Sequence, residues 1–317
     1  MTRWTAHDIP DLSGRRAIIT GANSGIGFYT ALELARHGAS VVMASRDEAR
    51  GRDAVRQVAQ QADRGSAELG LVDLADLSSV RRFADLYRER HTTLDILVNN
   101  AGVMAIPRRQ TVDGFEMQLG TNHLGHFALT GRLLPVLLNT PGARVIMVSS
   151  GAHKGATIDF EDLQGERSYQ PWRAYGQSKL ANLLFAFELQ RRAKADLLSV
   201  AAHPGYAGTN LQLAGPRMRG DRLQVLFFRL ANRLVAQPAS QGALPSLYAA
   251  TSPDVVPGGY YGPDRFGEMR GHPKLVTASR EAYDEDAARR LWQISEELTG
   301  VRYEFSPGDA GATEGIR

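Results

Sequence analysis

Two side chains that could move a proton stand four positions apart in the chain. Tyr175 and Lys179 fall in a stretch whose apolar pattern predicts a helix over about 174–195, so both side chains lie on one helix face. A free tyrosine titrates near ~10, which is too high for a base at neutral pH. A neighbouring positive charge favours the phenolate and lowers that pKa. The pair is therefore suited to general acid/base chemistry at a substrate oxygen.

Polar and small residues follow two of the predicted strands. Ser149 and Ser150 come directly after a strand at 145–148, and Asn99, Asn100, Ala101 and Gly102 follow a strand at 94–98. Ligands of open α/β sheets bind beyond such carboxyl ends. A serine there can hold a substrate oxygen, although a serine at a strand end is equally common as a turn former.

Asn122 lies inside a long helical pattern, about 115–138, where asparagine is a poor helix former. Its side chain is therefore expected to make a specific hydrogen bond, either in the site or to its own helix. Four nearby histidines are interpreted as neutral packing or loop residues without a chemical role. They are His123, His126, His153 and His203.

A glycine-rich loop separates the first predicted strand, 17–20, from the first helix. Thr20, Gly21, Gly25 and Gly27 form the pattern TGxxxGxG. Small residues in this setting let backbone amides approach a pyrophosphate at a helix N-terminus. The loop is predicted to hold a dinucleotide cofactor, and the residues assigned to that contact are Gly21, Ser24, Gly25, Ile26 and Gly27.

The end of the second strand of such folds distinguishes NAD from NADP, because an acidic residue there binds the ribose hydroxyls and repels a 2′-phosphate. Here the end reads Ala44, Ser45 and Arg46. Arg46 can pair with the 2′-phosphate through its planar guanidinium. NADP(H) is favoured, and the alternative is that Arg46 is simply a solvated residue at a helix start.

These residues need a scaffold of alternating strands and helices, and the sequence supplies one. Apolar runs predict strands at 17–20, 41–44, 67–72, 94–98, 145–148 and 198–202. Helical patterns follow the first five of them, including 48–62 and 79–90. Continuous apolar runs are typical of strands covered on both faces. The predicted fold is α/β: a Rossmann-type, doubly wound parallel sheet with helices on both faces.

The pattern changes after His203. Four glycines, Gly205, Gly208, Gly215 and Gly220, precede an apolar stripe at helical spacing over 223–235. We expect a substrate flap over about 205–238 that admits a bulky apolar substrate. The alternatives are packing on the core, on another subunit or on a membrane surface. A last helix is expected near 286–298, within a single catalytic domain over 1–305, and a disordered tail over 306–317.

Composition excludes several classes of function. The chain has 317 residues, 43% of them hydrophobic, a net charge of +3 and no cysteine. The absence of cysteine excludes disulfides and thiolate-ligated metal, and no metal site is expected. The charges form no polybasic block, so nucleic acid is not an expected partner. Without a signal peptide or a membrane-length apolar run, the expected location is the cytoplasm.

Taken together, the motifs resemble the short-chain dehydrogenase/reductase family in order and spacing from about Leu12 to Gly208. The shared features are TGxxxGxG, an aspartate after the third strand, NNAG at 99–102, the helix asparagine, the strand-end serine and YxxxK. Within that family the chain is most similar to the retinol dehydrogenase and protochlorophyllide reductase branch, as the stretches 122–127 and 149–153 indicate. The chain lacks the spanning helix of membrane-anchored retinol dehydrogenases.

The resemblance implies a role for each matched residue. Ser150 orients the carbonyl, Tyr175 passes the proton, Lys179 binds the ribose and tunes Tyr175, and Asn122 holds a water in the proton relay. The resemblance also implies cofactor contacts by residues that follow other strands, with Asp73 by the adenine and with Pro204, Gly205 and Thr209 near the nicotinamide amide. These are Asp73, Leu74, Asn100, Ala101, Gly102, Pro204, Gly205 and Thr209.

The leading hypothesis is an NADP(H)-dependent oxidoreductase that moves a hydride between nicotinamide and a carbonyl or alcohol carbon of an apolar small molecule. One alternative is a regulatory protein that binds NADP but has lost catalysis, and another is a nucleotide-sugar epimerase or dehydratase of related fold. An intact tyrosine and lysine pair argues against a pure binding protein. A homo-oligomer is usual in families resembling this one.

Overall fold

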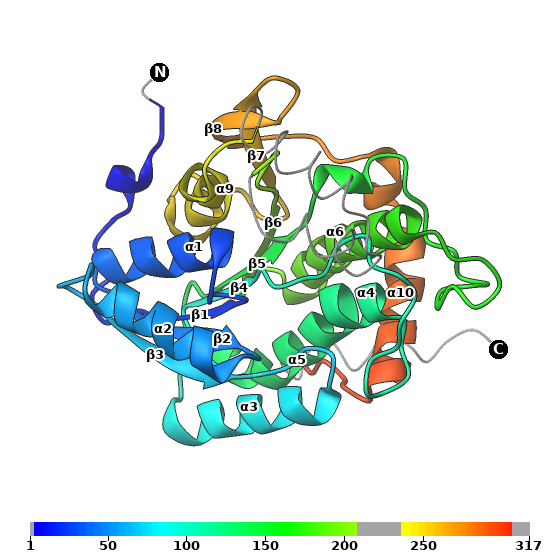
Figure 1. Ribbon diagram of the computed structural model, residues 1–317, viewed down its shortest axis with the longest axis horizontal. Helices are drawn as coiled ribbons and strands as arrows, with labels where there is room; N and C mark the ends of the chain where they lie inside the picture. The colour runs from blue at the N-terminus through cyan, green and yellow to red at the C-terminus, as the bar shows by residue number, and fades with distance from the viewer. Residues whose placement is uncertain (1–2, 208–235, 306–317) are drawn as a thin grey trace.

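A mostly parallel sheet runs through the centre of the protein (Figure 1). The computed structural model describes residues 3–207 and 236–305. Within those ranges the sheet has eight strands in the order β3-β2-β1-β4-β5-β6-β7-β8. Neighbouring strands from β3 to β7 are parallel, and β8 pairs antiparallel with β7 at the edge. The predicted α/β fold class is confirmed, with one antiparallel strand added.

The strands that sequence patterns predicted are present within one or two residues. The strands are β1 Arg16–Thr20, β2 Ser40–Ser45, β3 Ser66–Leu71, β4 Ile96–Asn99, β5 Arg144–Val148, β6 Leu198–Ala202, β7 Tyr260–Arg265 and β8 Arg270–Leu275. The main helices are α1 Gly25–Arg36, α2 Glu48–Ala59, α3 Leu77–Arg90, α4 Met117–Leu119, α5 Gly125–Leu138, α6 Pro171–Ala193, α9 Ala239–Thr251 and α10 Glu285–Thr299.

Helices cover both faces of the sheet, and each face has its own apolar core. On one face α1, α2 and α9 pack against side chains such as Ile19 and Val41. On the other face α3, α5 and α6 pack against neighbours such as Ile18 and Val42, with α10 outside α6. Figure 1 shows α1 and α9 on one side of the strands and α3 and α5 on the other. Alternation along β1 and β2 thus builds two cores, as a doubly covered sheet requires.

The strand order reverses between β1 and β4. From β1 the chain proceeds outward to β2 and β3, then returns to β4 on the other side of β1 and proceeds to β5 and β6. The connections that follow β1 and β4 therefore diverge at the carboxyl edge, which opens a crevice between them. The motifs predicted to bind the cofactor and substrate follow these same strands.

The predicted helix over 115–138 is wrong as a single element. It consists of the short α4, a π-helical turn over Gly120–Leu124, and α5. Gly120 and Gly125 flank the turn, and both pack closely: a Cβ at Gly125 would collide with the Leu74 carbonyl. Asn122 lies in the wider turn, where the backbone departs from the regular α-helical pattern.

Three elements were not predicted. Strands β7 and β8 read YYGPDR and RGHPKL, and proline, glycine and charge mask the apolar signal of a strand. Helix α9 contains Pro245, which a sequence pattern interprets as a helix break. The apolar stripe of the predicted flap, Thr209 and the predicted tail at 306–317 lie outside the described residues.

The hydroxyl of Thr20, at the end of β1, joins three segments of the crevice. Its oxygen accepts hydrogen bonds from the backbone amides of Asn100 at 2.8 Å and Ala101 at 2.9 Å, and it lies 2.8 Å from His126 Nε2. The other ring nitrogen, Nδ1, lies 2.9 Å from the Asn122 carbonyl, which can only accept. His126 therefore carries its proton on Nδ1, and Nε2 accepts from the Thr20 hydroxyl.

Burial lowers the pKa of His126 to about 3, so the neutral ring suits this chain of bonds. Thr20 and His126 are fully buried. The chain of bonds fixes the end of β1 relative to the loop after β4 and to the turn that carries Asn122. The position of His126 agrees with the expectation that this histidine is neutral and structural.

We expect Thr20→Val to lower the free energy of unfolding by about 2 to 4 kcal/mol, because Ala101 N–H and His126 Nε2 both lose their partner inside the protein. Thr30→Val is the matched control. Thr30 is equally buried, but its hydroxyl bonds only to the Ile26 carbonyl of its own helix, so its loss should be about 1 kcal/mol or less. Urea unfolding of both variants measures the difference, and equal losses would contradict the role given to Thr20.

Candidate active site

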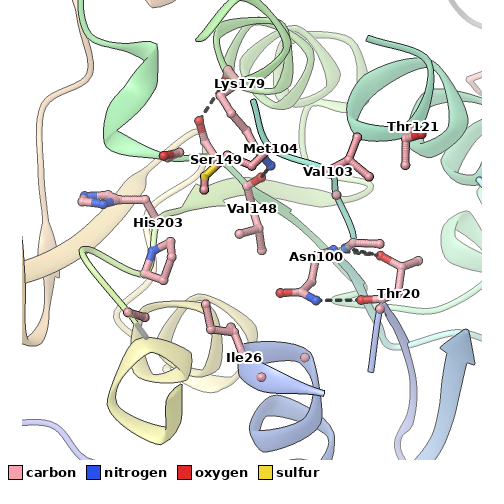
Figure 2. Close-up of a pocket in the computed structure, with 18 of the residues that line it drawn as sticks. Thr20, Ile26, Asn100, Val103, Met104, Thr121, Val148, Ser149, Lys179 and His203 are labelled. Carbon is pink, nitrogen blue, oxygen red and sulfur yellow. Dashed lines mark hydrogen bonds between the residues drawn. The ribbon is translucent and has the colours of Figure 1, made fainter. Parts of the chain in front are cut away.

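A cavity of about 760 Å³ opens at the carboxyl edge of the sheet. It collects almost all of the residues singled out in the sequence. Those that line it are Gly21, Ser24, Gly25, Ile26, Gly27, Arg46, Asp73, Leu74, Asn100, Ala101, Gly102, Ser150, Tyr175, Lys179, Pro204 and Gly205. Asn122 lies behind the wall, and Thr209 lies outside the described residues. Figure 2 shows the central part of this cavity.

The glycine-rich loop passes over the loop that follows β4. Asn100 Nδ2 donates to the Thr20 carbonyl at 2.8 Å, a contact visible in Figure 2. A Cβ at position 27 would lie 2.5 Å from the Gly21 carbonyl oxygen and 2.6 Å from Asn100 Nδ2. Glycine is therefore required at position 27 by this crossing alone. Ser24 precedes α1 as its N-cap, so the helix N-terminus faces the cavity with its first amides unpaired by the helix.

Arginines gather where the cavity reaches the end of β2. Arg46 and Arg50 both line it, together with Ser45 and Asp47. The Asp47 carboxylate accepts from Arg50 N at 3.0 Å as the cap of α2 and lies 3.4 Å from Arg50 Nε. The one acidic side chain at this end is thus engaged by its own helix, and Arg46 and Arg50 supply a positive surface.

Asp73 and Leu74 form the wall after β3. The Asp73 carboxylate accepts from Ala75 N at 2.9 Å, and the Asp73 backbone amide donates to Ser79 Oγ at 3.0 Å. These bonds hold the turn between β3 and α3 open towards the cavity. Leu74 is buried and contributes an apolar surface.

Tyr175 and Lys179 are both buried on α6 and face the same part of the cavity. Lys179 Nζ lies 5.9 Å from the centre of the Tyr175 ring and donates to the Val148 carbonyl at 3.0 Å. Burial lowers the pKa of Lys179 to about 8. Burial also raises the pKa of Tyr175 to about 12, and the Ser150 side chain partly offsets that rise. The protein alone therefore keeps the tyrosine protonated at neutral pH. The lowered pKa expected from the sequence required an oxidised nicotinamide as well as the nearby ammonium.

The two serines after β5 have different environments. Ser149 is buried and donates its hydroxyl to the Lys179 carbonyl at 2.8 Å. The Ser150 oxygen accepts from Ala152 N at 3.2 Å, which leaves its hydroxyl proton for a partner in the cavity. Ser150, and not Ser149, is therefore placed to bond a substrate oxygen beside Tyr175.

The Asn122 side chain is fully buried and hydrogen-bonded on both of its ends. Its Oδ1 accepts from Val103 N at 2.8 Å, and its Nδ2 donates to the Val103 carbonyl and to Ser178 Oγ, each at 2.9 Å. The expected specific bond thus ties the π-helical turn to the loop after β4 and to α6. In the described structure Asn122 acts as a support for the wall that contains Gly102 and Val103.

The sequence matches a known enzyme family. The sequence profile described as short chain dehydrogenase matches residues 15–217. The chain belongs to the short-chain dehydrogenase family. It is accordingly an oxidoreductase that acts on alcohol and carbonyl groups, and its fold binds a nicotinamide cofactor. The family resemblance stated from the sequence is confirmed.

Relatives and solved structures agree with this family. Retinol dehydrogenase 14 of Mus musculus is 41% identical over 303 residues, which cover 92% of this chain and 87% of the relative. Polyprenol dehydrogenase of Mus musculus is 42% identical over 302 residues, which cover 92% and 86%. A crystal structure of an uncharacterized protein from Mycobacterium paratuberculosis is 45% identical with a TM-score of 0.78, covering 96% of this chain and 100% of that one.

Several cavity residues of this short-chain dehydrogenase were not singled out from its sequence. They are Asn23, Arg50, Met104, Lys154, Trp172, Tyr206, Glu268 and Met269. Arg50 could have been found from its place one helical turn after Arg46. Glu268 and Met269 could not, because they reach the cavity through the unpredicted hairpin of β7 and β8.

The described ranges, 3–207 and 236–305, contain neither a metal-binding cluster nor a helix that could span a membrane. They hold no cluster of three or more histidine, aspartate or glutamate side chains that could bind a metal ion. None of their helices is both long and apolar enough to cross a membrane.

Proposed function

We propose that this short-chain dehydrogenase transfers a hydride between NADP(H) and a carbonyl or alcohol carbon of a bulky apolar substrate. The observation that carries the proposal is the convergence of Ser150, Tyr175 and Lys179 on one wall of the cavity whose other wall is the glycine-rich loop. Hydride transfer requires that the cofactor and the reacting carbon lie together in one cavity from which water is largely excluded.

The side chains divide the work at the substrate oxygen. Ser150 donates its hydroxyl proton to that oxygen, and Tyr175 passes a proton to it during reduction or accepts one during oxidation. Lys179 donates to the Val148 carbonyl at 3.0 Å and keeps further protons on Nζ for the ribose. A bound nicotinamide would supply the hydride or accept it. The pKa of Tyr175, which burial raises, would be lowered by the positive charge of the oxidised form.

Asn122 supports this arrangement without reaching the cavity itself. Its bonds to Val103 and Ser178 hold the loop after β4 against α6. We propose that a water relayed to Lys179 sits beside this contact, as the family resemblance implies. The cofactor contacts proposed for Pro204, Gly205 and Thr209 remain predictions of the same kind.

Replacement of Tyr175 by phenylalanine should abolish turnover while cofactor binding persists, because only the phenolic oxygen is lost. We expect the rate to fall by about 10² to 10⁴, measured by absorbance at the NADPH band with a long-chain aldehyde. Activity of the variant within a few-fold of the parent would remove Tyr175 from the mechanism.

The pH dependence of the unaltered enzyme gives a second test. Since Tyr175 must be ionised to accept a proton, the rate of alcohol oxidation should rise with pH, whereas the rate of carbonyl reduction should not.

The preference for NADP(H) is supported by the charge at the end of β2. Arg46 and Arg50 line the cavity there, and Asp47 is held by α2. A structure of RhlG from Pseudomonas aeruginosa, 25% identical with a TM-score of 0.60, is of a complex with NADP. An exposed guanidinium pair suits the doubly charged 2′-phosphate better than a ribose hydroxyl.

Arg46→Ala should narrow the preference for NADPH over NADH by about tenfold or more, because a charge-assisted phosphate contact contributes roughly 1.5 to 3 kcal/mol. Dissociation constants for both cofactors, measured by titration calorimetry, provide the test. Arg52→Ala is the control, since Arg52 lies on α2, the helix that follows Arg46, pairs with Glu48 and does not line the cavity. Equal constants for the two cofactors in the unaltered protein would contradict the assignment.

A bulky apolar substrate is supported by the side chains around Tyr175. Met104 packs with Tyr175, and the Trp172 ring meets the Tyr175 ring edge-on at 6.0 Å. Trp172 is 52% exposed and Met269 is 42% exposed, although both line the cavity. Exposed large apolar groups beside a reacting centre are typical of a surface that a ligand covers. Retinol and polyprenol, in the names of the relatives, are apolar alcohols.

Trp172→Ala should reduce kcat/KM for a ten-carbon aldehyde at least about tenfold and leave a three-carbon aldehyde nearly unchanged, because only the longer chain reaches the indole. Steady-state kinetics over a series of straight-chain aldehydes measures the trend. Leu86→Ala serves as control, because Leu86 is also 52% exposed but lies on α3 outside the cavity. An equal loss for every aldehyde would mean that Trp172 does not contact the chain of the substrate.

The alternatives are less well supported. A regulatory protein without catalysis needs no buried tyrosine beside a lysine, and an epimerase or dehydratase retains its nucleotide through the cycle. Stoichiometric consumption of NADPH with an apolar aldehyde distinguishes the oxidoreductase from both. The cytoplasmic location, the single domain over 1–305 and a homo-oligomer remain predictions from the sequence.

A further inference from the structure

The hairpin of β7 and β8 touches the segment that follows β6. Tyr206 N donates to the Met269 carbonyl at 2.8 Å. Gly205 has a φ of 64°, and a Cβ there would collide with the same carbonyl. The hairpin tip and residues 203–206 thus pack backbone to backbone. Glycine is required at position 205 both by its positive φ and by the close approach of the Met269 carbonyl.

One side chain of the hairpin tip bridges two loops of the active site. Glu268 Oε2 lies 3.0 Å from Lys154 Nζ, on the segment after β5, and 3.3 Å from His203 Nε2, at the end of β6. His203 Nδ1 accepts from Gly205 N at 3.3 Å, so the ring proton is on Nε2, which lies near Glu268 Oε2 but makes no hydrogen bond to it. The His203 imidazole and the Lys154 ammonium together hold the pKa of Glu268 at about 2.

The burial of this bridge distinguishes it from an ordinary surface pair. The Glu268 side chain is 20% exposed and the His203 side chain 3% exposed. Exposed pairs contribute little because water screens them. The Lys154 side chain is 48% exposed, but the carboxylate that it bonds is part-buried beside the His203 ring, so water screens this charge-assisted bond less than that of a fully exposed pair. Glu268 also lines the cavity, so the bridge lies next to the ligand and not on a remote surface.

Gln237 holds the opposite side of the same segment. Its Nε2 donates to the Pro204 carbonyl at 2.7 Å, and its Oε1 accepts from Gly271 N, on β8, at 3.2 Å. Residues 203–206 are therefore fixed between two polar contacts, both of which lead to the hairpin. Of the two, only the Glu268 contact also reaches the loop that carries Ser150.

We propose that Glu268 is a positioning residue that holds residues 203–206 in the shape that receives the nicotinamide end of the cofactor. The inference rests on the proposed function, in which Pro204 and Gly205 contact that end. Glu268 lies on the hairpin of β7 and β8, and β1, β4, β5 and β6 separate that hairpin from β2 in the sheet. Its loss should therefore weaken the nicotinamide contacts and leave the adenosine contacts beside the arginines that follow β2 intact.

Binding of the whole cofactor and of its adenosine half tests the proposal. Calorimetry would compare NADPH with 2′,5′-ADP, and NADH with AMP in parallel, for the parent protein and Glu268→Gln. We expect the dissociation constant of NADPH to rise about tenfold, as for a lost charge-assisted bond, and that of 2′,5′-ADP to stay within twofold. Glu161→Gln is the control, since its exposed pair with Arg290 lies outside the cavity.

The binding data distinguish failure of the role proposed for Glu268 from failure of the proposed function. Unchanged NADPH binding, or an equal loss for both ligands, would overturn the role of Glu268. If the parent protein binds neither dinucleotide, the proposed function fails first; if NADH binds better than NADPH, the NADH and AMP pair carries the same test. Lys154→Met, which removes the other partner of the bridge, should give a smaller loss in the same direction, and thermal unfolding confirms that each variant is folded.

Discussion

The hydroxyl of Thr20 is the contact on which the geometry of the active site depends. Two backbone amides donate to its oxygen, and its proton goes to His126, which in turn donates to the Asn122 carbonyl. Every polar atom of this chain has a partner, as buried polar groups in a low-dielectric interior require. The switch point of the sheet separates β1 from β4 in sequence but leaves them adjacent, so one small side chain can join the loops that follow both strands.

Hydrogen bonds also fix the backbone around Tyr175 and Lys179. Lys179 reaches the Val148 carbonyl, and Ser149 returns a bond to the Lys179 carbonyl. Strand β5 and helix α6 are thus linked in both directions at the level of the reacting centre. Burial in the protein alone lowers the pKa of Lys179 and raises the pKa of Tyr175.

The sequence predicts those parts of the fold whose signals are local. The loop from Thr20 to Gly27 and the pair Tyr175 and Lys179 carry their spacing within one turn or one helix, so both could be placed correctly. Strands β7 and β8 could not, because the hydrogen bonds of a neighbouring strand, and not their own apolar residues, make them strands. The turn at Asn122 was missed because a π-helical widening leaves a normal helical periodicity on either side.

Glu268 could not be found from a sequence pattern either, because its role depends on tertiary contacts. Its partners Lys154 and His203 are distant in sequence, and nothing in the residues around it differs from a solvated loop. The place of Met269 beside Gly205 likewise depends on two backbones meeting. Such residues become visible only once the sheet order is known.

The late position of the β7 and β8 hairpin in the chain has a consequence for biogenesis. The Lys154 and Glu268 side chains are 114 residues apart in sequence, so a chain emerging from the ribosome completes β1 to β6 long before the hairpin exists. Contacts of such separation form slowly, since the loop must close before they stabilise anything. A nascent chain would therefore display strands β1 to β6 while the side of the cavity formed by Glu268 and Met269 is still missing, until β7 and β8 emerge.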